Sequence, residues 1–472
     1  MIPATIRALI ETTGAKLVHG SPEIRFTGVS TDTRTLQPGD LYISLSGPNF
    51  DGNRFAANAV EGGAAGVVLR AEDGAPPPAL GASSRGVPLL THLDPRRALT
   101  ELATWHRSRL AAEVVGITGS CGKTTTKNIL KELLRAVVES ESPNAVIASP
   151  SSFNNDIGVP HTLFLADETT DVAVVEMGTN GPGEIAALTR IAKPIGGVIT
   201  TVGAAHLEGL KSVEGVAHEK SALVAGLPRE GFAILNADSP WTPWIRTVTD
   251  AAVTTFSVDG DGDFNASDVW FHSAGTTFRM GDYEVTSPLL GLHNVQNLLA
   301  ALVTCVSLGF DLERCLSAVS TLKPSHRRLE RRVLGGKTLI DDSYNANPES
   351  ARASVRVLAG LHGHERRVLV LGDMLELGSH APELHHEIGE LAANSGVDLL
   401  VTVGELGKAT AAGALEGGLA TGEVVHCEDV NEAMDEVPHL VREGDVVLIK
   451  GSRQAGLDRV VQHLIELSSG AA

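Results

Sequence analysis

Short apolar runs separated by turns occupy the start of the chain. LYISL and GVVL predict buried strands, and turns such as QPGD and GPNFDGN flank them. The following stretch, AEDGAPPPALGASSRG, is rich in Gly, Pro and Ser and predicts an exposed loop. From Pro95 to Leu110 the apolar residues recur near helical spacing, which predicts a helix. These patterns indicate a first unit at residues 1–93.

Strands alternate with helical patterns in the remainder of the chain. AEVVGIT, DVAVVEMG, GGVITTVG and FAILNAD predict strands, and segments such as KNILKELLRAVV predict the helices between them. This alternation is typical of a parallel sheet covered on both faces, and it predicts a second unit at residues 94–322. RRVLVLGDM, DLLVTVGE and DVVLIKGS repeat the pattern in a third unit, residues 323–472, of dinucleotide-fold type. The predicted fold class is α/β with three domains.

Composition and charge narrow the function. The 472 residues include 38 Lys and Arg against 57 Asp and Glu, which gives a net charge of −19. This balance argues against a general nucleic-acid binder and against adhesion to an anionic membrane. The opening MIPATIRALIETTG predicts no signal peptide, no apolar run is long enough for a membrane span, and the four cysteines are scattered. We therefore expect a cytoplasmic protein with no stable membrane insertion. A monomer is expected, but no sequence feature determines the oligomeric state.

The strongest single motif is VVGITGSCGKTTTK, from Val114 to Lys127. A predicted strand runs into a glycine-bearing turn and then a helix, so backbone N–H groups and the helix N-terminus face one point. Lys123 supplies a charge for the phosphates and Thr124 a hydroxyl for Mg²⁺. Ile117 stands where the strict pattern has glycine, so a plain glycine turn remains the alternative. The predicted nucleotide-binding residues of this loop are Gly119, Ser120, Cys121, Gly122, Lys123, Thr124 and Thr125.

Five motifs follow one another along the chain and suggest a family. TGSCGKTT, EMGTN at 176–180, AHLEG at 205–209, GLHNVQN at 291–297 and DDSYNANP at 341–348 together resemble the Mur ligases, the ATP-dependent amide-forming enzymes of peptidoglycan precursor synthesis. SSFNNDIGVP at 151–160, DDSYNANP and LGDMLELG at 371–378 resemble one member in particular. That member joins UDP-N-acetylmuramoyl-tripeptide to D-alanyl-D-alanine.

The resemblance implies a domain plan and a reaction. The N-terminal domain is expected to bind the UDP-sugar, the central domain ATP, and the C-terminal domain the incoming amine while it closes over the nucleotide. A carboxylate attacks the γ-phosphate of ATP to give an acyl phosphate and ADP, and the amine then displaces phosphate. The implied cofactors are ATP and Mg²⁺, with two ions expected.

Five residues are implied to be catalytic or to bind metal, and Lys123 of the glycine-rich loop is one of the catalytic residues. Glu176 ends the strand DVAVVEMG, where open α/β sheets bind ligands, and by resemblance it binds Mg²⁺ with Thr124. By resemblance His206 joins a second Mg²⁺. Lys220 corresponds to a lysine that the family carbamylates, which would turn a cation into a metal-binding anion. A capping or solvated glutamate, a structural histidine and a surface lysine are the alternatives.

The remaining candidates are assigned to nucleotide and substrates. Asn294 and Asn297 share a helix face and suit the adenine edge, although Asn294 could instead cap the helix. By resemblance Arg328 and Asp342 contact phosphate or ribose, with Tyr344 and Asn347 as neighbours; adjacent Arg327 and Asp341 leave the register open. The candidates for substrate binding are Ser30, Thr31, Asp32 and Arg34 for the UDP-sugar, Asn154 and Asn155 for the γ-phosphate or acceptor carboxylate, and Lys450, Ser452 and Arg453 for the dipeptide.

Other functions remain open at this stage. A Mur-type ligase or a folylpolyglutamate synthase would add a different amino acid, but DDSYNANP and LGDMLELG argue against that. A phosphoryl-transfer or motor ATPase usually places Asp where this chain has Glu176. A catalytically inactive nucleotide-binding scaffold is the third possibility. The third residue of the tripeptide, lysine or diaminopimelate, is left undetermined.

Overall fold

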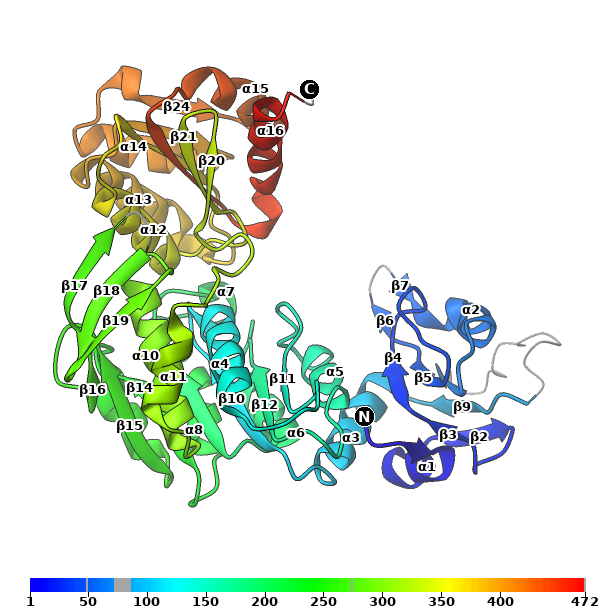
Figure 1. Cartoon of the computed structure of the whole chain (residues 1–472). Coiled ribbons are helices and arrows are strands. Elements are labelled where there is room, and N and C mark those ends of the chain that lie inside the picture. The colour runs from blue at the N-terminus through cyan, green and yellow to red at the C-terminus, as the bar shows by residue number, and fades with distance from the viewer. Residues whose placement is uncertain (48–49, 72–85, 273–274, 471–472) are drawn as a thin grey trace.

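Three units follow one another in space as they do in the sequence. The computed structural model describes residues 1–47, 50–71, 86–272 and 275–470. Residues 72–85, most of the predicted exposed loop, lie outside this description, as do residues 48 and 49 of the predicted GPNFDGN turn. In Figure 1 the N-terminal unit and the C-terminal unit occupy opposite ends of a central unit.

The N-terminal unit is built on a five-stranded sheet in the order β2-β9-β8-β5-β4, with only β2 antiparallel to its neighbour. LYISL contributes to β5 and GVVL to β8. The bounds of this sheet are β2 Lys16–His19, β4 Gly28–Ser30, β5 Asp40–Ile43, β8 Gly66–Arg70 and β9 Leu89–His92. Around it lie β1 (Ala4–Thr5), β3 (Arg25–Phe26), β6 (Ser46–Gly47), β7 (Phe50–Asp51), α1 (Ile6–Thr13), η1 (Gly52–Phe55) and α2 (Ala56–Glu61).

Helix α3 (Pro95–Arg107) connects the first two units. Asp94 caps it by accepting hydrogen bonds from the N–H groups of Arg96 and Arg97. Its buried Leu99 belongs to one apolar cluster with Ile6 of α1 and Leu163 of the central unit. The N-terminal and central units therefore share a hydrophobic core.

The central unit contains seven parallel strands in the order β11-β12-β10-β13-β14-β15-β16. Their bounds are β10 Glu113–Thr118, β11 Val146–Ala148, β12 Val172–Glu176, β13 Gly196–Ile199, β14 Phe232–Asn236, β15 Ala252–Ser257 and β16 Phe264–Asn265. An antiparallel sheet follows, made of β17 (Ser267–His272), β18 (Gly275–Met280) and β19 (Tyr283–Ser287). The helical segments are α4 Lys123–Val137, α5 Gly158–Phe164, α6 Glu184–Ala192, α7 Leu207–Leu210, α8 Val213–Ala225, α9 Thr242–Ile245, η3 Arg246–Val248, α10 Leu292–Ser307 and α11 Leu312–Val319.

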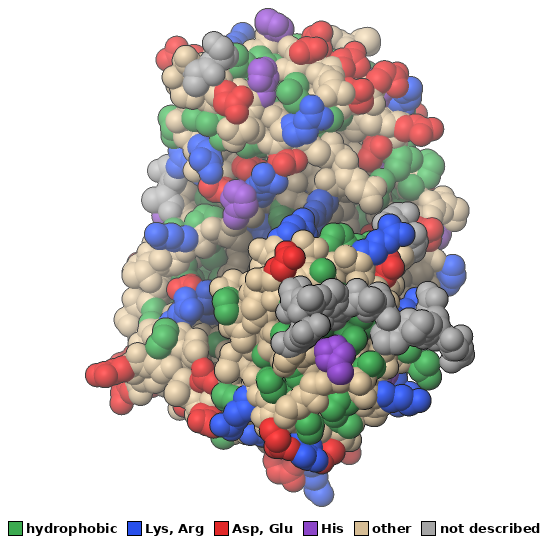
Figure 2. Space-filling view, turned by 90° about the vertical axis from the view of Figure 1, so that its right-hand side faces the viewer, with side chains coloured by type: hydrophobic (Ala, Val, Ile, Leu, Met, Phe, Trp, Pro, Cys, Tyr) green, Lys and Arg blue, Asp and Glu red, His purple; other side chains and the backbone are tan. Residues whose placement is uncertain are grey.

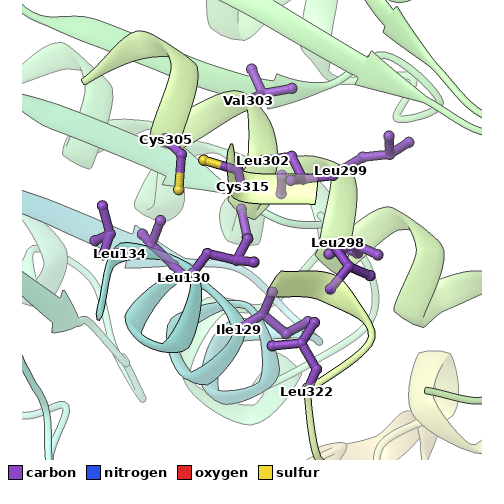
Figure 3. Packing of buried hydrophobic residues seen from close by; sticks show 14 of the residues in the cluster. Ile129, Leu130, Leu134, Leu298, Leu299, Leu302, Val303, Cys305, Cys315 and Leu322 are labelled. Atoms are coloured by element: carbon purple, nitrogen blue, oxygen red, sulfur yellow. The ribbon is translucent and has the colours of Figure 1, made fainter. Parts of the chain in front are cut away.

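Helices cover both faces of the parallel sheet. Figure 3 shows Ile129, Leu130 and Leu134 of α4 packed near Leu298 and Leu302 of α10, within the cluster that covers one face. The opposite face packs against α3, α5 and α6 through the core shared with the N-terminal unit. This packing fixes the start of α4, and with it the glycine-rich loop, relative to the strand ends.

The C-terminal unit is a six-stranded sheet in the order β20-β21-β25-β22-β23-β24, parallel except for the β20–β21 pair. Its strands are β20 Glu330–Leu334, β21 Lys337–Asp342, β22 Arg366–Gly372, β23 Leu399–Val403, β24 Val424–Cys427 and β25 Asp445–Lys450. Its helices are α12 Pro348–Gly360, η4 Gly378–His380, α13 Ala381–Asn394, α14 Gly407–Glu416, η5 Thr421–Glu423, α15 Val430–Leu440, η6 Arg453–Ala455 and α16 Asp458–Ser468. Two apolar clusters cover its faces. The predicted three-domain α/β fold is confirmed, while the boundaries given above stay a prediction.

The face drawn in Figure 2 shows no large uniform field of one charge. On the face in Figure 2, Lys and Arg side chains are interspersed with Asp and Glu, and basic side chains also lie in the recess between the upper and lower parts. Within the ranges that the structure describes, none of the helices has the length and apolar character needed to cross a bilayer.

Candidate active site

A cavity of about 440 Å³ lies between the central and C-terminal units. The predicted residues that line it from the central unit are Ser120, Cys121, Gly122, Lys123, Thr124, Thr125, Asn154, Asn155, Glu176, His206, Asn294 and Asn297. Those that line it from the C-terminal unit are Arg328, Asp342, Tyr344, Asn347, Lys450, Ser452 and Arg453. Among the described residues, six candidates lie outside this lining: Gly119, Lys220, Ser30, Thr31, Asp32 and Arg34.

The glycine-rich loop forms the floor of the cavity between β10 and α4. Gly122 has φ +87°, and a Cβ there would overlap the side-chain oxygen of Asn297. Helix α4 begins at Lys123, whose ammonium donates to the carbonyl oxygen of Gly119 at 2.6 Å. Burial lowers the pKa of Lys123, while the nearby Glu176 raises it. The loop therefore presents N–H groups, a helix N-terminus and one lysine to the same space.

Glu176 is buried at the end of β12, with 1% of its surface exposed, so the solvated alternative is wrong. Asn154 Nδ2 donates to Oε1 at 3.0 Å, whereas Oε2 has no hydrogen-bond donor among the described residues. The ammonium of Lys127 lies 3.6 Å from Oε2. Sequence reasoning did not single out Lys127, although it lies one helical turn after Lys123 and hence on the same face of α4.

His206 lies at the start of α7 and contacts the C-terminal unit. Its Nδ1 lies 2.6 Å from Oε2 of Glu376, which follows β22. The hydrogen bond from His206 lowers the pKa of Glu376. Glu376 also lines the cavity. It belongs to the LGDMLELG motif, but the motif alone gave no role for this carboxylate.

Lys220 is buried in α8, with 1% of its surface exposed, which excludes the surface-lysine alternative. Burial, and then the charge of Lys123, hold the pKa of Lys220 well below its usual range. Within the described ranges, no group accepts a hydrogen bond from its ammonium. Neighbouring Glu219 instead accepts from the N–H groups of Gly183 and Ile185 at the start of α6.

The two asparagines of α10 form a short polar chain beside the loop. Asn297 Nδ2 donates to Asn294 Oδ1 at 3.1 Å, and Thr126 donates to Asn297 Oδ1 at 3.2 Å. Asn294 Nδ2 donates to the carbonyl oxygen of Leu290. Gly291 occupies the N-cap position of α10, so the capping alternative for Asn294 is wrong.

The C-terminal unit contacts the glycine-rich loop through two side chains and the segment after β11 through a third. Arg328 donates to Thr124 Oγ1 at 3.1 Å and lies over the ring of Tyr344, 4.4 Å from its centroid. Asn347 caps α12 and also donates from Nδ2 to the carbonyl oxygen of Ser120 at 3.1 Å. Tyr344 in turn donates to Ser152 Oγ at 2.6 Å. DDSYNANP thus joins the two units at the cavity.

The ends of β21 and β25 complete this wall. The Lys450 ammonium is 2.7 Å from Asp342 Oδ2 and also donates to the carbonyl oxygen of Asn345 at 3.0 Å. Ser354 donates to the same Asp342 oxygen. The Ser452 hydroxyl is buried and has no partner among the described residues. This wall therefore contains the ion pair between Lys450 and Asp342 and the unpaired hydroxyl of Ser452.

The N-terminal candidates lie apart from the cavity. Asp32 and Arg34 pair with one another, and the side chain of Arg34 is 86% exposed. Thr31 Oγ1 lies 3.0 Å from His161 Nε2, so this hydrogen bond crosses from the first unit to α5 of the central unit. Sequence reasoning assigned no role to His161, because only the fold brings it to Thr31.

Comparison with known proteins identifies the family that shares this architecture. Family models match residues 25–106 (Mur ligase family, catalytic domain), 117–305 (Mur ligase middle domain) and 327–453 (Mur ligase, glutamate ligase domain). A UDP-N-acetylmuramoyl-tripeptide–D-alanyl-D-alanine ligase of Escherichia coli is 36% identical, with 99% of each chain covered. The chain belongs to the Mur ligase family.

Related proteins cover the whole length of this Mur ligase. The enzyme of the same name from Bacillus subtilis is 34% identical, with 99% of both chains covered. The structure of MurF from Acinetobacter baumannii has a TM-score of 0.88 at 28% identity and covers 98% of this chain and 99% of its own. A MurF ligase from Thermotoga maritima in complex with ADP has a TM-score of 0.78 at 26% identity and covers 94% and 99%.

The cavity of this Mur ligase has donors that fit a divalent cation. Carboxylate and hydroxyl oxygens are the ligands that Mg²⁺ prefers, and Glu176 offers a buried oxygen without a hydrogen-bond donor. Thr124 lines the same cavity, and its hydroxyl oxygen accepts a hydrogen bond from Arg328. These two side chains fit the metal role that the sequence analysis gave them.

Proposed function

We propose that this Mur ligase joins the terminal carboxylate of UDP-N-acetylmuramoyl-tripeptide to the amine of D-alanyl-D-alanine, with conversion of ATP to ADP and phosphate. The observation that carries the proposal is the cavity, where the glycine-rich loop, the Glu176 carboxylate and the DDSYNANP segment meet. Relatives named for this reaction match the chain from end to end. The reaction would take place in the cytoplasm, where ATP is available, and one chain supplies both walls of the site.

In the first step the peptide carboxylate attacks the γ-phosphorus, and the bond to the β,γ-bridging oxygen breaks to release ADP. Two anions must approach, so the site has to neutralise charge and align them. We assign this role to the loop N–H groups and to Lys123, whose ammonium would leave the carbonyl oxygen of Gly119 for a phosphate oxygen. Asn154, fixed by its hydrogen bond to Glu176, would orient the acceptor carboxylate.

Thr124 and Glu176 would hold one Mg²⁺, and His206 with carbamylated Lys220 a second. When bound, these ions supply positive charge to the phosphate oxygens. A carbamate forms only from a neutral amine, and burial beside Lys123 favours the neutral form of Lys220. The resulting anion would also compensate the charge of Lys123.

The nucleotide would bridge the two units. Asn294 and Asn297 would contact adenine, and Arg328, Asp342, Tyr344 and Asn347 ribose or phosphate. In the second step the dipeptide amine attacks the acyl carbon, the C–O bond to phosphate breaks, and the amine loses a proton. Lys450, Ser452 and Arg453 are proposed to hold the dipeptide, since the buried hydroxyl of Ser452 lacks a partner. The exposed Arg34, with Ser30, Thr31 and Asp32, is proposed to bind the UDP-sugar.

The assay should supply ATP, Mg²⁺ and UDP-linked tripeptide in lysine and diaminopimelate forms, with D-Ala-D-Ala or single amino acids as acceptors. We expect ADP release and a product whose mass includes both D-alanine residues only with the dipeptide. ADP release without an amide product would support a phosphoryl-transfer ATPase instead. A product formed with a single amino acid would support a different Mur-type ligase.

The carbamate requires a separate test. ¹³C-labelled bicarbonate should give a carbonyl resonance in the wild-type protein that is absent from Lys220→Arg. Lys211→Arg is the matched control, because Lys211 is exposed after α7 and contacts the carbonyl oxygen of Glu208. The same resonance in all three proteins would exclude Lys220 as the carbamylated residue.

A further inference from the structure

His206 and Glu376 meet across the two units although they lie 170 residues apart in the chain. The imidazole Nδ1 is 2.6 Å from Glu376 Oε2, and the backbone N–H of Glu208 donates to the carbonyl oxygen of Glu376 at 3.2 Å. Two hydrogen bonds therefore hold the loop after β22 against the start of α7. Both contacts lie beside the cavity.

Both partners have unusual backbone conformations. His206 has φ +54° and Glu376 φ +64°, in the left-handed region that non-glycine residues rarely adopt. The side chains are 23% and 55% exposed, and ion pairs of such exposure contribute little to stability. The stability gained from this ion pair does not explain why two residues with strained backbones occur here. Backbone strain is common at functional sites that must hold one geometry.

The contact leaves the other ring nitrogen of His206 available. With Nδ1–H donating to the carboxylate, Nε2 carries a lone pair, and among the described residues no group is bonded to it. A metal-binding histidine typically donates its second ring N–H to a carboxylate, which fixes the tautomer and the ring plane. Glu376 is in the position of that carboxylate.

We propose that Glu376 is a positioning residue: it orients His206 for the second metal ion and makes that site complete only when the C-terminal unit is docked. The proposal rests on the proposed function, which gives His206 its metal. Because Glu376 comes from one unit and His206 from the other, docking strengthens metal binding and metal binding strengthens docking by the same factor. The second metal ion would therefore bind tightly beside the reacting phosphate only when the two units are docked.

The alternative is that the pair only holds the units together. Three variants of the full chain separate the two. Glu376→Ala removes the carboxylate, and Glu376→Gln keeps a hydrogen-bond acceptor without the charge. Ser325→Ala is the matched control, because it removes a different contact between the units, from Asn128 Nδ2 to Ser325 Oγ at 2.9 Å, away from the cavity lining.

The measurement is Mn²⁺ binding, followed by electron paramagnetic resonance in the presence of a non-hydrolysable ATP analogue. Loss of such a supporting partner typically weakens metal affinity about 10–100-fold. We expect a loss in this range for the weaker Mn²⁺ site in Glu376→Ala, a smaller loss in Glu376→Gln, and less than a twofold change in Ser325→Ala. Nitrogen NMR of His206 should show the Nδ1–H tautomer in the wild type and a mixture in Glu376→Ala.

Two outcomes overturn the proposal. Either Glu376→Ala binds both Mn²⁺ ions within twofold of wild type, or Ser325→Ala weakens binding as much as Glu376→Ala does. Circular dichroism of each variant checks folding, and the near-isosteric Glu376→Gln decides if Glu376→Ala does not fold. Failure of the proposed function is distinguishable, because it would leave the wild-type protein with two bound ions but no amide product.

Discussion

Lys127 and Glu176 form a buried ion pair beneath the cavity. The ammonium and carboxylate are 3.6 Å apart, and their side chains are 2% and 1% exposed. Lys127 also donates to the carbonyl oxygen of Ser149 at 2.8 Å, so it ties α4 to the turn after β11. The carboxylate proposed to bind metal is thus paired with a lysine that does not line the cavity.

Lys127→Met should be strongly destabilising, because it leaves the Glu176 carboxylate buried without its cation. Breaking such a pair typically costs about 3–5 kcal/mol. All four tryptophans, Trp105, Trp241, Trp244 and Trp270, lie in residues 94–322, so tryptophan fluorescence in urea follows the central unit. Lys131→Met, one turn further along α4 and partly exposed, is the control and should change stability by less than about 0.5 kcal/mol.

A double variant refines this prediction. Lys127→Met combined with Glu176→Gln removes both charges, so part of the lost stability should return. Equal stability of Lys127→Met and the Lys131→Met control would show that the pair does not matter for the fold.

Lys123→Ala should reduce turnover about 10²–10³-fold, the usual cost of removing one group that stabilises charge in a transition state. The fold should survive, because among the described residues the ammonium donates a hydrogen bond only to a carbonyl of its own loop. The measurement is kcat for dipeptide-dependent ADP release, with the urea midpoint as a check on folding. Turnover equal to that of wild type would remove Lys123 from the mechanism.

Variants of Asn347 should distinguish its role as a helix cap from its role in docking the two units. Its Oδ1 accepts from the N–H of Ser350, while its Nδ2 donates to the Ser120 carbonyl oxygen. Asn347→Asp keeps the cap but opposes the phosphates with a negative charge, whereas Asn347→Ala loses both contacts. We expect a stability loss of about 1 kcal/mol for Asn347→Ala alone. Calorimetry should show weaker ATP binding in both, more so in Asn347→Asp; unchanged ATP affinity in both would contradict the bridging role.

The hydrophobic pattern of the sequence predicted the strands and helices that carry the site. It predicted the contacts between these elements less well. DVAVVEMG predicts β12 and puts Glu176 at its end, because a buried parallel strand is a continuous apolar run. Helix α4 begins at Lys123, before the apolar run that signalled it, since the turn at Gly122 sets its start. The antiparallel strands β17 to β19 were not anticipated, because their alternation is interrupted: Trp270 and Phe271 are adjacent and both partly exposed.

Long-range partners were out of reach of sequence reasoning. Lys450 was assigned to the dipeptide, yet its ammonium bonds to Asp342, which is 108 residues away in the chain. Glu376 and His206 are separated still further. Local patterns report which residues are buried and where elements end, but they do not report which elements become neighbours.

His106 provides a prediction about acid stability. It is fully buried in α3, and Nε2 lies 3.1 Å from the carbonyl oxygen of Ala166. Burial lowers the pKa of His106 to about 4, from an ordinary value of 6.5. Between pH 4 and 6.5, His106 is therefore protonated in the unfolded chain but neutral in the folded chain.

The sign follows from the direction of this shift. The contribution of His106 is fully present above pH 6.5 and is lost as the pH falls towards 4, by roughly 3 kcal/mol over the whole interval. His106→Gln keeps an N–H donor for Ala166 but does not titrate, so its stability should depend less on pH in this window. Urea unfolding followed by tryptophan fluorescence at pH 7.5, 6, 5 and 4 provides the comparison. The prediction is contradicted if the stabilities of the two proteins change with pH in parallel. The folded state would then take up the His106 proton as readily as the unfolded chain does, which is not expected of a fully buried, neutral imidazole.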